Sequence, residues 1–130
     1  MKLAQILERI ENARIGEPVK LIAVSKNVTT KEVLELFEQG QTSFGENRVQ
    51  ELKNKREILS NLPIEWHFIG RLQSNKINHL LALKPALWQS CESVEAALAV
   101  DKRLGCELPC LLQINSARED SKQGISPEAA

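Results

Sequence analysis

The chain has 130 residues, enough for one ordinary domain with a hydrophobic core. Its 17 basic and 17 acidic residues balance, which argues against nucleic acid or a membrane surface as its partner. No apolar run approaches the ~20 residues of a membrane-spanning helix, and the first residues do not form a signal peptide. Cys91, Cys106 and Cys110 lack metal-ligand spacing, so we expect no metal site, and buried or half-buried thiols in a reducing, cytoplasmic compartment.

The first part of the chain predicts a helix, a strand and a second helix. Apolar residues within 3–14 recur at the spacing of an amphipathic helix. The nearly continuous apolar run at 19–24 is typical of a strand that is buried on both faces in a parallel sheet. Thr29 and Glu32 fit a capping box, which predicts a helix that ends near Gly40.

The same alternation continues along the rest of the chain. Strands are predicted to begin near residues 19, 42, 66, 86 and 110, and this period of about two dozen residues is the size of one βα unit. No Asn-Gly or Asp-Gly pair marks a hairpin, so we expect parallel strands with right-handed crossovers. An open doubly wound sheet and part of a closed barrel both fit this pattern.

The last residues bear on that choice. Ser126, Pro127 and Glu128 match a helix start, with a serine N-cap, proline at the first position and an acid in the first turn, but only two alanines follow. Because so short a helix has no stability of its own, we expect the chain to be the front part of a longer protein. Five strands are a little over half of a barrel of ~250 residues. The alternative is a complete five-stranded sheet with a frayed tail.

Polar residues follow the predicted strands, where parallel sheets and barrels place their ligands. Lys26 follows the first strand, and an amine there can form a Schiff base; the alternative is an exposed loop lysine. His67 points into the interior if Phe68 points the other way; the alternative is a hydrogen-bonded core histidine. Arg71 and Lys76 lie near a helix N-terminus, a place suited to an anion.

Four segments together resemble the pyridoxal phosphate homeostasis protein family. They are Ala-Val-Ser-Lys at 23–26, Phe-Gly-Glu-Asn-Arg-Val-Gln-Glu at 44–51, Trp-His-Phe-Ile-Gly at 66–70 and Leu-Gln-Ser-Asn-Lys at 72–76. The resemblance implies an α/β fold: a parallel (β/α) barrel of the TIM or alanine racemase N-terminal type, of which this chain holds the first five βα units. Residues 1–130 are then a single, partial barrel domain that binds pyridoxal 5′-phosphate (PLP).

The same resemblance implies a cofactor site. It places PLP on Lys26 as a Schiff base, with Asn47 beside the cofactor and His67 in the pocket lining, and it names no catalytic residue. It implies a role in intracellular PLP homeostasis, with PLP-dependent apoenzymes as candidate partners. The family's serine- and glycine-rich phosphate segments have no counterpart here, so we expect them beyond residue 130 and expect this chain alone to hold PLP weakly.

Three functions remain open: a PLP carrier without rapid turnover, a racemase-like PLP enzyme acting on amino acids, and a phosphate-binding α/β module in which Lys26 is only a cation. A PLP enzyme needs a proton donor and acceptor on the two faces of its substrate. In alanine racemases, which this barrel resembles, a tyrosine serves one face, and this chain has no tyrosine. That favours the carrier. The module is disfavoured because no Gly-x-Gly-x-x-Gly motif or P-loop is present.

Overall fold

The computed structural model describes residues 2–105 and 107–130. Its five strands form one parallel sheet in the order β1-β2-β3-β4-β5. The strands are β1 (Ala23–Val24), β2 (Ser43–Glu46), β3 (Glu65–Phe68), β4 (Leu87–Cys91) and β5 (Cys110–Leu112). The helices are α1 (Leu3–Ala13), α2 (Thr30–Glu38), α3 (Val49–Ile58), α4 (Ile77–Ala82) and α5 (Val94–Asp101), with short 3₁₀ turns η1 (Ser74–Lys76) and η2 (Pro127–Ala129).

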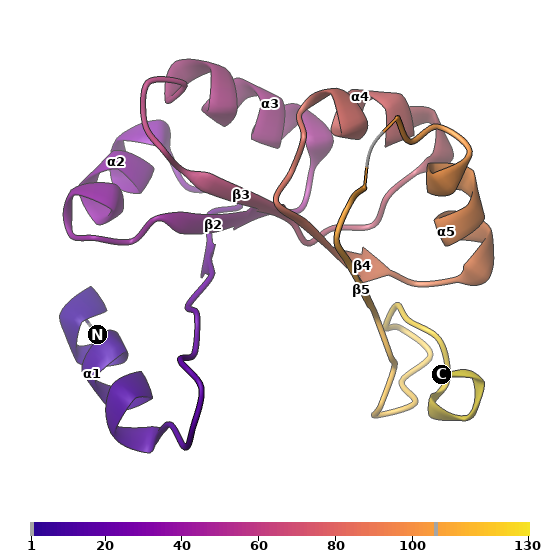
Figure 1. Cartoon of the computed structure of the whole chain (residues 1–130), viewed down its shortest axis with the longest axis horizontal. Coiled ribbons are helices and arrows are strands. Elements are labelled where there is room, and N and C mark those ends of the chain that lie inside the picture. Colours follow the sequence, from indigo (N-terminus) through magenta and orange to yellow (C-terminus); the bar gives the residue numbers. More distant parts are fainter. Residues whose placement is uncertain (1, 106) are drawn as a thin grey trace.

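The strand order and the side on which the helices lie decide between the two architectures. Helices α2 to α5 cover one side of the sheet, while α1 and the segment after β5 lie at the two ends of the other side (Figure 1). A doubly wound sheet reverses its strand order and carries helices on both faces. Here each strand pairs with the next along the chain, as in a (β/α) barrel with its helices outside. The fold is therefore the first part of such a barrel, with five strands of which the first four are each followed by an α-helix.

The predicted helix starts are largely confirmed. Before α2, the Thr29 hydroxyl accepts a hydrogen bond from the backbone N–H of Glu32 at 3.3 Å, and the Glu32 carboxylate accepts from the Thr29 N–H at 2.9 Å. The hydrogen bonds that the Thr29 N–H and the Thr29 hydroxyl donate to this carboxylate, at 2.9 and 2.7 Å, lower the pKa of Glu32. Ser93 caps α5 through the N–H of Ala96 at 3.0 Å. Ser126 occupies the N-cap position of η2, with Pro127 and Glu128 in its first turn as predicted, but the Ser126 side chain makes no capping hydrogen bond.

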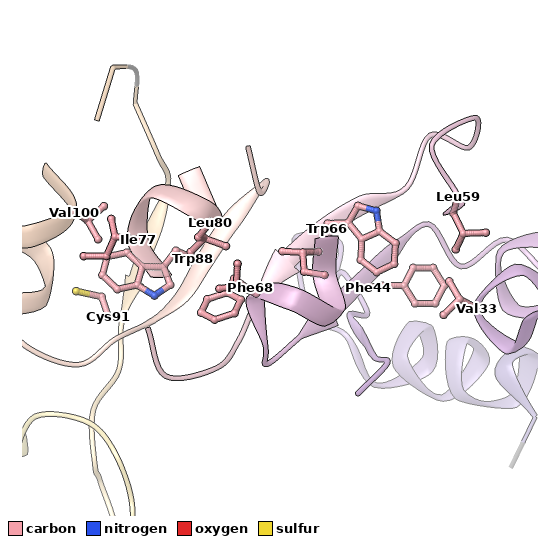
Figure 2. Close-up of a cluster of buried hydrophobic side chains, with 12 residues drawn as sticks. Val33, Phe44, Leu59, Trp66, Phe68, Ile77, Leu80, Trp88, Cys91 and Val100 are labelled. Atoms are coloured by element: carbon pink, nitrogen blue, oxygen red, sulfur yellow. The ribbon is translucent and has the colours of Figure 1, made fainter. Parts of the chain in front are cut away.

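The hydrophobic core fills the layer between the sheet and helices α2 to α5 (Figure 2). Large apolar side chains on β2, β3 and β4 point to the helices and meet small and branched side chains from them. The rings of Phe44 and Trp66 pack with their centroids 5.9 Å apart. Burial is complete for Phe44, Phe68 and Leu52. Residues alternate between the two faces of a strand. The strand residues next to Phe44 and Phe68 in sequence therefore lie on the opposite, concave face of the sheet.

The two outermost strands are more exposed than predicted. Val19 and Val24 are 59% and 53% exposed, so the expectation of a first strand buried on both faces is wrong. The reason is that, within the described residues, β1 pairs only with β2, and that Val24 shares the face of its register partner Gly45, opposite to the face of the core residue Phe44. The same holds on β5, where Cys110 is exposed, contrary to expectation, whereas Cys91 on β4 is buried. Cys106 lies outside the described residues.

Within the described residues, no helix combines the length and the apolar character that crossing a membrane requires. The same residues contain no group of three or more side chains suited to hold a metal ion.

We expect Thr29→Ala to lower the free energy of unfolding by about 1 kcal/mol, because it removes the capping oxygen of α2. Urea unfolding monitored by circular dichroism measures the change. Thr30→Ala, the same chemical change one residue later, is the matched control and should leave the free energy nearly unchanged. Equal effects of the two variants would contradict a specific role of the cap.

Candidate functional site

Lys26 lies in a tight turn directly after β1. The backbone N–H of Val28 donates to the carbonyl of Ser25 at 3.1 Å, which closes the turn. Asn27, at its third position, has a φ of 60°, a conformation that asparagine tolerates better than most residues. Lys26 occupies the second position and is exposed. The turn therefore presents the Lys26 amine at the carboxyl end of the sheet.

A buried ion pair anchors this turn from the helix side of the sheet. The Lys55 ammonium of α3 donates to the Glu46 carboxylate of β2 at 2.6 Å and to the Ser25 carbonyl at 2.7 Å. The Ser25 hydroxyl donates to the same carboxylate oxygen at 2.6 Å. The side chains of Lys55 and Glu46 are 5% and 0% exposed. These bonds tie the residue before Lys26 to both a neighbouring strand and a helix.

Strand register places the three predicted cofactor residues at two levels. Val24 pairs with Gly45, and Gly45 pairs with His67. Lys26 and Asn47 each follow this row by two residues, so they share the level at the carboxyl end of the sheet. His67 lies one pleat deeper, about 7 Å along the strand. The structure thus brings Lys26 and Asn47 to one end and sets His67 below them.

A glycine holds the next loop against Asn47. A Cβ atom on Gly70 would lie 1.9 Å from the backbone oxygen of Asn47, so a residue with a side chain does not fit there. The Ser90 hydroxyl of β4 donates to the Gly70 carbonyl at 2.5 Å. The ends of β2, β3 and β4 are therefore joined through this glycine.

His67 belongs to a chain of polar side chains across the concave face. Its Nε2 lies 2.6 Å from the Glu65 carboxylate, and its Nδ1 lies 2.9 Å from the amide nitrogen of Gln89. Because that amide nitrogen donates, Nδ1 accepts and Nε2 carries the proton given to Glu65. Glu65 also accepts from the Lys20 ammonium at 2.9 Å. His67 thus faces the interior as predicted and is also the hydrogen-bonded, buried histidine of the alternative.

These polar contacts perturb Glu65. Hydrogen bonds from Lys20 and, second, from His67 hold the pKa of the Glu65 carboxyl below its ordinary value. Glu65 precedes His67 by two residues, so strand alternation could have placed it on the same face. Nothing local marked Gln89 or Lys55, because their partners come from other elements.

In sequence, the chain is similar to curated proteins named pyridoxal phosphate homeostasis protein, although no family model matches it. It is 48% identical to the Helicobacter pylori (strain 26695) protein over 99% of this chain and 61% of that protein. The identity to the Aquifex aeolicus protein is 38%, over 98% of this chain and 59% of that protein. The chain therefore spans about three fifths of the length of these relatives.

Solved structures agree with this likeness. PipY of Synechococcus elongatus PCC7942 without PLP has a TM-score of 0.78 and 37% identity, covering 96% of this chain and 60% of that one. The same protein with PLP bound has a TM-score of 0.74 and 36% identity, covering 95% and 59%. Fold and site define the front part of a parallel (β/α) barrel with an amine at its carboxyl end. The expected resemblance to the pyridoxal phosphate homeostasis protein family is confirmed.

We expect Lys55→Met to lower the free energy of unfolding by about 3–5 kcal/mol, because it leaves the buried Glu46 carboxylate without its counter-charge. The double variant Glu46→Leu with Lys55→Met should be less destabilised than the single one. Lys53→Met is the matched control on the same helix: its ion pair with Glu57 is exposed at 3.9 Å, so its change should stay within about 0.5 kcal/mol. Urea unfolding at neutral pH measures all three, and equal losses for Lys53→Met and Lys55→Met would contradict the assignment.

We expect Glu65 to contribute to the pH dependence of stability in acid. Its folded pKa is lowered from the ordinary 4.5, so the unfolded chain takes up its proton first as the pH falls. Its contribution is therefore present above that ordinary value and is lost as the pH drops through the lower folded value. The difference in unfolding free energy between wild type and Glu65→Gln should shrink over that range. Glu38→Gln, an exposed control, should show no such change, and a constant wild-type-to-Glu65→Gln difference would refute the role.

Proposed function

We propose that this chain is the front part of a single barrel domain that binds PLP as a Schiff base on Lys26. We place the whole protein in intracellular PLP homeostasis in the cytoplasm, with PLP-dependent apoenzymes as partners. The observation that carries the proposal is the Lys26 amine, presented beside Asn47 at the carboxyl end of the sheet. The support from comparison is a likeness to PipY, a protein of known structure with PLP bound.

The residues present suit such a cofactor. Neither the Lys26 ammonium nor the Asn47 amide has a hydrogen-bond or ion-pair partner within the described part of the chain, and Asn47 is half-buried. Both groups are therefore free to contact a ligand. Below them, Gly45 lies between Val24 and His67 in the strand register, and the Ile69 and Ile22 side chains pack against its backbone, since a Cβ there would come within 3.2 Å and 3.4 Å of them.

The chemistry of attachment is a condensation. Lys26 would hold PLP through a Schiff base, formed between its amine and the PLP aldehyde with the loss of one water molecule. PLP supplies an electron sink when it is bound. The turn at Ser25, held by Lys55 and Glu46, keeps the Lys26 backbone in place for this reaction. Asn47 offers an amide that can donate or accept a hydrogen bond beside it.

The polar chain below favours binding over turnover. Both ring nitrogens of His67 are engaged, by Glu65 and by Gln89. An imidazole in this state does not take a proton from a substrate without giving up one of those bonds. We therefore assign His67 to the lining of the pocket and favour a carrier over an amino-acid enzyme.

The test is intact mass spectrometry after incubation with PLP and reduction with borohydride. We expect one reduced PLP adduct on the wild type and none on Lys26→Ala or Lys26→Arg. Lys31→Ala, an exposed lysine at the start of α2, is the matched control and should keep the adduct. An adduct that persists on Lys26→Ala would overturn the assignment, and saturable turnover of an amino acid would replace the carrier with an enzyme.

A further inference from the structure

A basic groove lies between α3 and α4, in the helix layer outside the sheet. It consists of two adjoining hollows of about 330 and 260 Å³, which share Val49, Gln50 and Lys76 in their walls. Phe68, a core residue of β3, and Asn47, which follows β2 at the carboxyl end of the sheet, both line the first hollow, whereas His67 lines neither hollow. The groove lies near the middle of the sheet, away from both edge strands.

The charged residues that line the groove are all basic. Arg48, Arg71 and Lys76 surround the first hollow, and Lys53 and His79 line the second, with no acidic residue in either wall. This clustering occurs in a chain whose acidic and basic residues balance.

Neighbouring acids offset this charge only in part. The Glu92 carboxylate oxygen Oε1 lies 3.4 Å from the Arg71 Nε, and the Glu57 Oε1 lies 3.9 Å from the Lys53 Nζ. Within the described residues, Arg48 and Lys76 have no ion-pair partner at all. The first hollow therefore carries positive charge that the protein itself does not neutralise.

The backbone adds to this field. Helix α3 has ten residues, and its N-cap, Arg48, makes no side-chain capping bond. The first N–H groups of a helix have no partner inside the helix, and here the residues that carry them, Val49 and Gln50, line the hollow. Two guanidinium groups beside these N–H groups match the oxygen atoms of a phosphoryl group, which arginine binds in a two-pronged fashion.

We propose that this groove binds an organic phosphate of about the size of a mononucleotide. Its phosphoryl group lies among Arg48, Arg71 and Lys76, and its organic part lies in the second hollow against Ala82 and Leu83. The two volumes together fall in the range of small-molecule sites, whereas an extended macromolecule needs a larger surface. Asn47 lines the first hollow and also lies beside Lys26, but Lys26 itself is not part of this site, so nucleotide binding and Schiff-base formation can be tested separately.

The test is isothermal titration with adenosine monophosphate, adenosine and inorganic phosphate as probes, at one ionic strength. We expect adenosine monophosphate to bind the wild type, and Arg48→Ala and Lys76→Ala each to weaken it by about tenfold or more, as loss of a charge-assisted hydrogen bond does. Adenosine should not bind, and inorganic phosphate should bind more weakly than the nucleotide. Circular dichroism confirms that these exposed-site variants remain folded.

Two further variants separate this site from the rest of the protein. Lys102→Ala removes one exposed positive charge at the end of α5, outside the groove, and should leave nucleotide binding unchanged. Lys26→Ala should lose the PLP adduct and keep the nucleotide, so that failure of one site does not imply failure of the other.

Three outcomes would overturn the proposal. They are no binding of adenosine monophosphate, binding that Arg48→Ala and Lys76→Ala leave intact, and inorganic phosphate binding as tightly as the nucleotide. The last would reduce the groove to a site for a simple anion.

Discussion

The carboxyl end of this sheet depends on one buried ion pair, Glu46 with Lys55, and on the Ser25 backbone and hydroxyl that it holds. Two charges removed from water are stable only when each is paired and hydrogen-bonded, and here the shared partner is the residue before Lys26. The pair joins β1, β2 and α3 at one point. The proposed cofactor amine is thus exposed on a turn whose base is among the most buried parts of the molecule.

The two faces of the sheet have different roles because strand residues alternate. On the helix side, aromatic side chains such as Phe44 and Trp88 form the core, and the buried Glu46–Lys55 ion pair lies on the same side. On the concave side, hydrogen bonds link polar side chains from Lys20 through Glu65 and His67 to Gln89. A ligand at the carboxyl end of the sheet therefore lies next to the hydrogen-bonded polar side chains of the concave face.

Glycines make the close approaches in this region possible. Gly45 removes a side chain from the row that contains Val24 and His67, and Gly70 lets the loop after β3 pass against the Asn47 backbone. The same loop, continuing through Arg71 to Lys76, leads to the basic groove on the helix side. Asn47 also lines the first hollow of the groove, so the groove and the proposed cofactor site lie next to each other at the same strand ends.

The sequence by itself determined the alternation of helices and strands, the parallel pairing and the caps at Thr29 and Ser93, because these depend on spacing along the chain. It also placed Lys26, Asn47 and His67 at or near strand ends. The pattern of elements alone left a barrel and a doubly wound sheet open, the family resemblance implied the barrel, and the strand order of the tertiary structure confirms it, since that order depends on the side to which each helix packs. Likewise, the bond from Lys55 to Ser25 joins residues 30 positions apart, and no local pattern encodes such a contact.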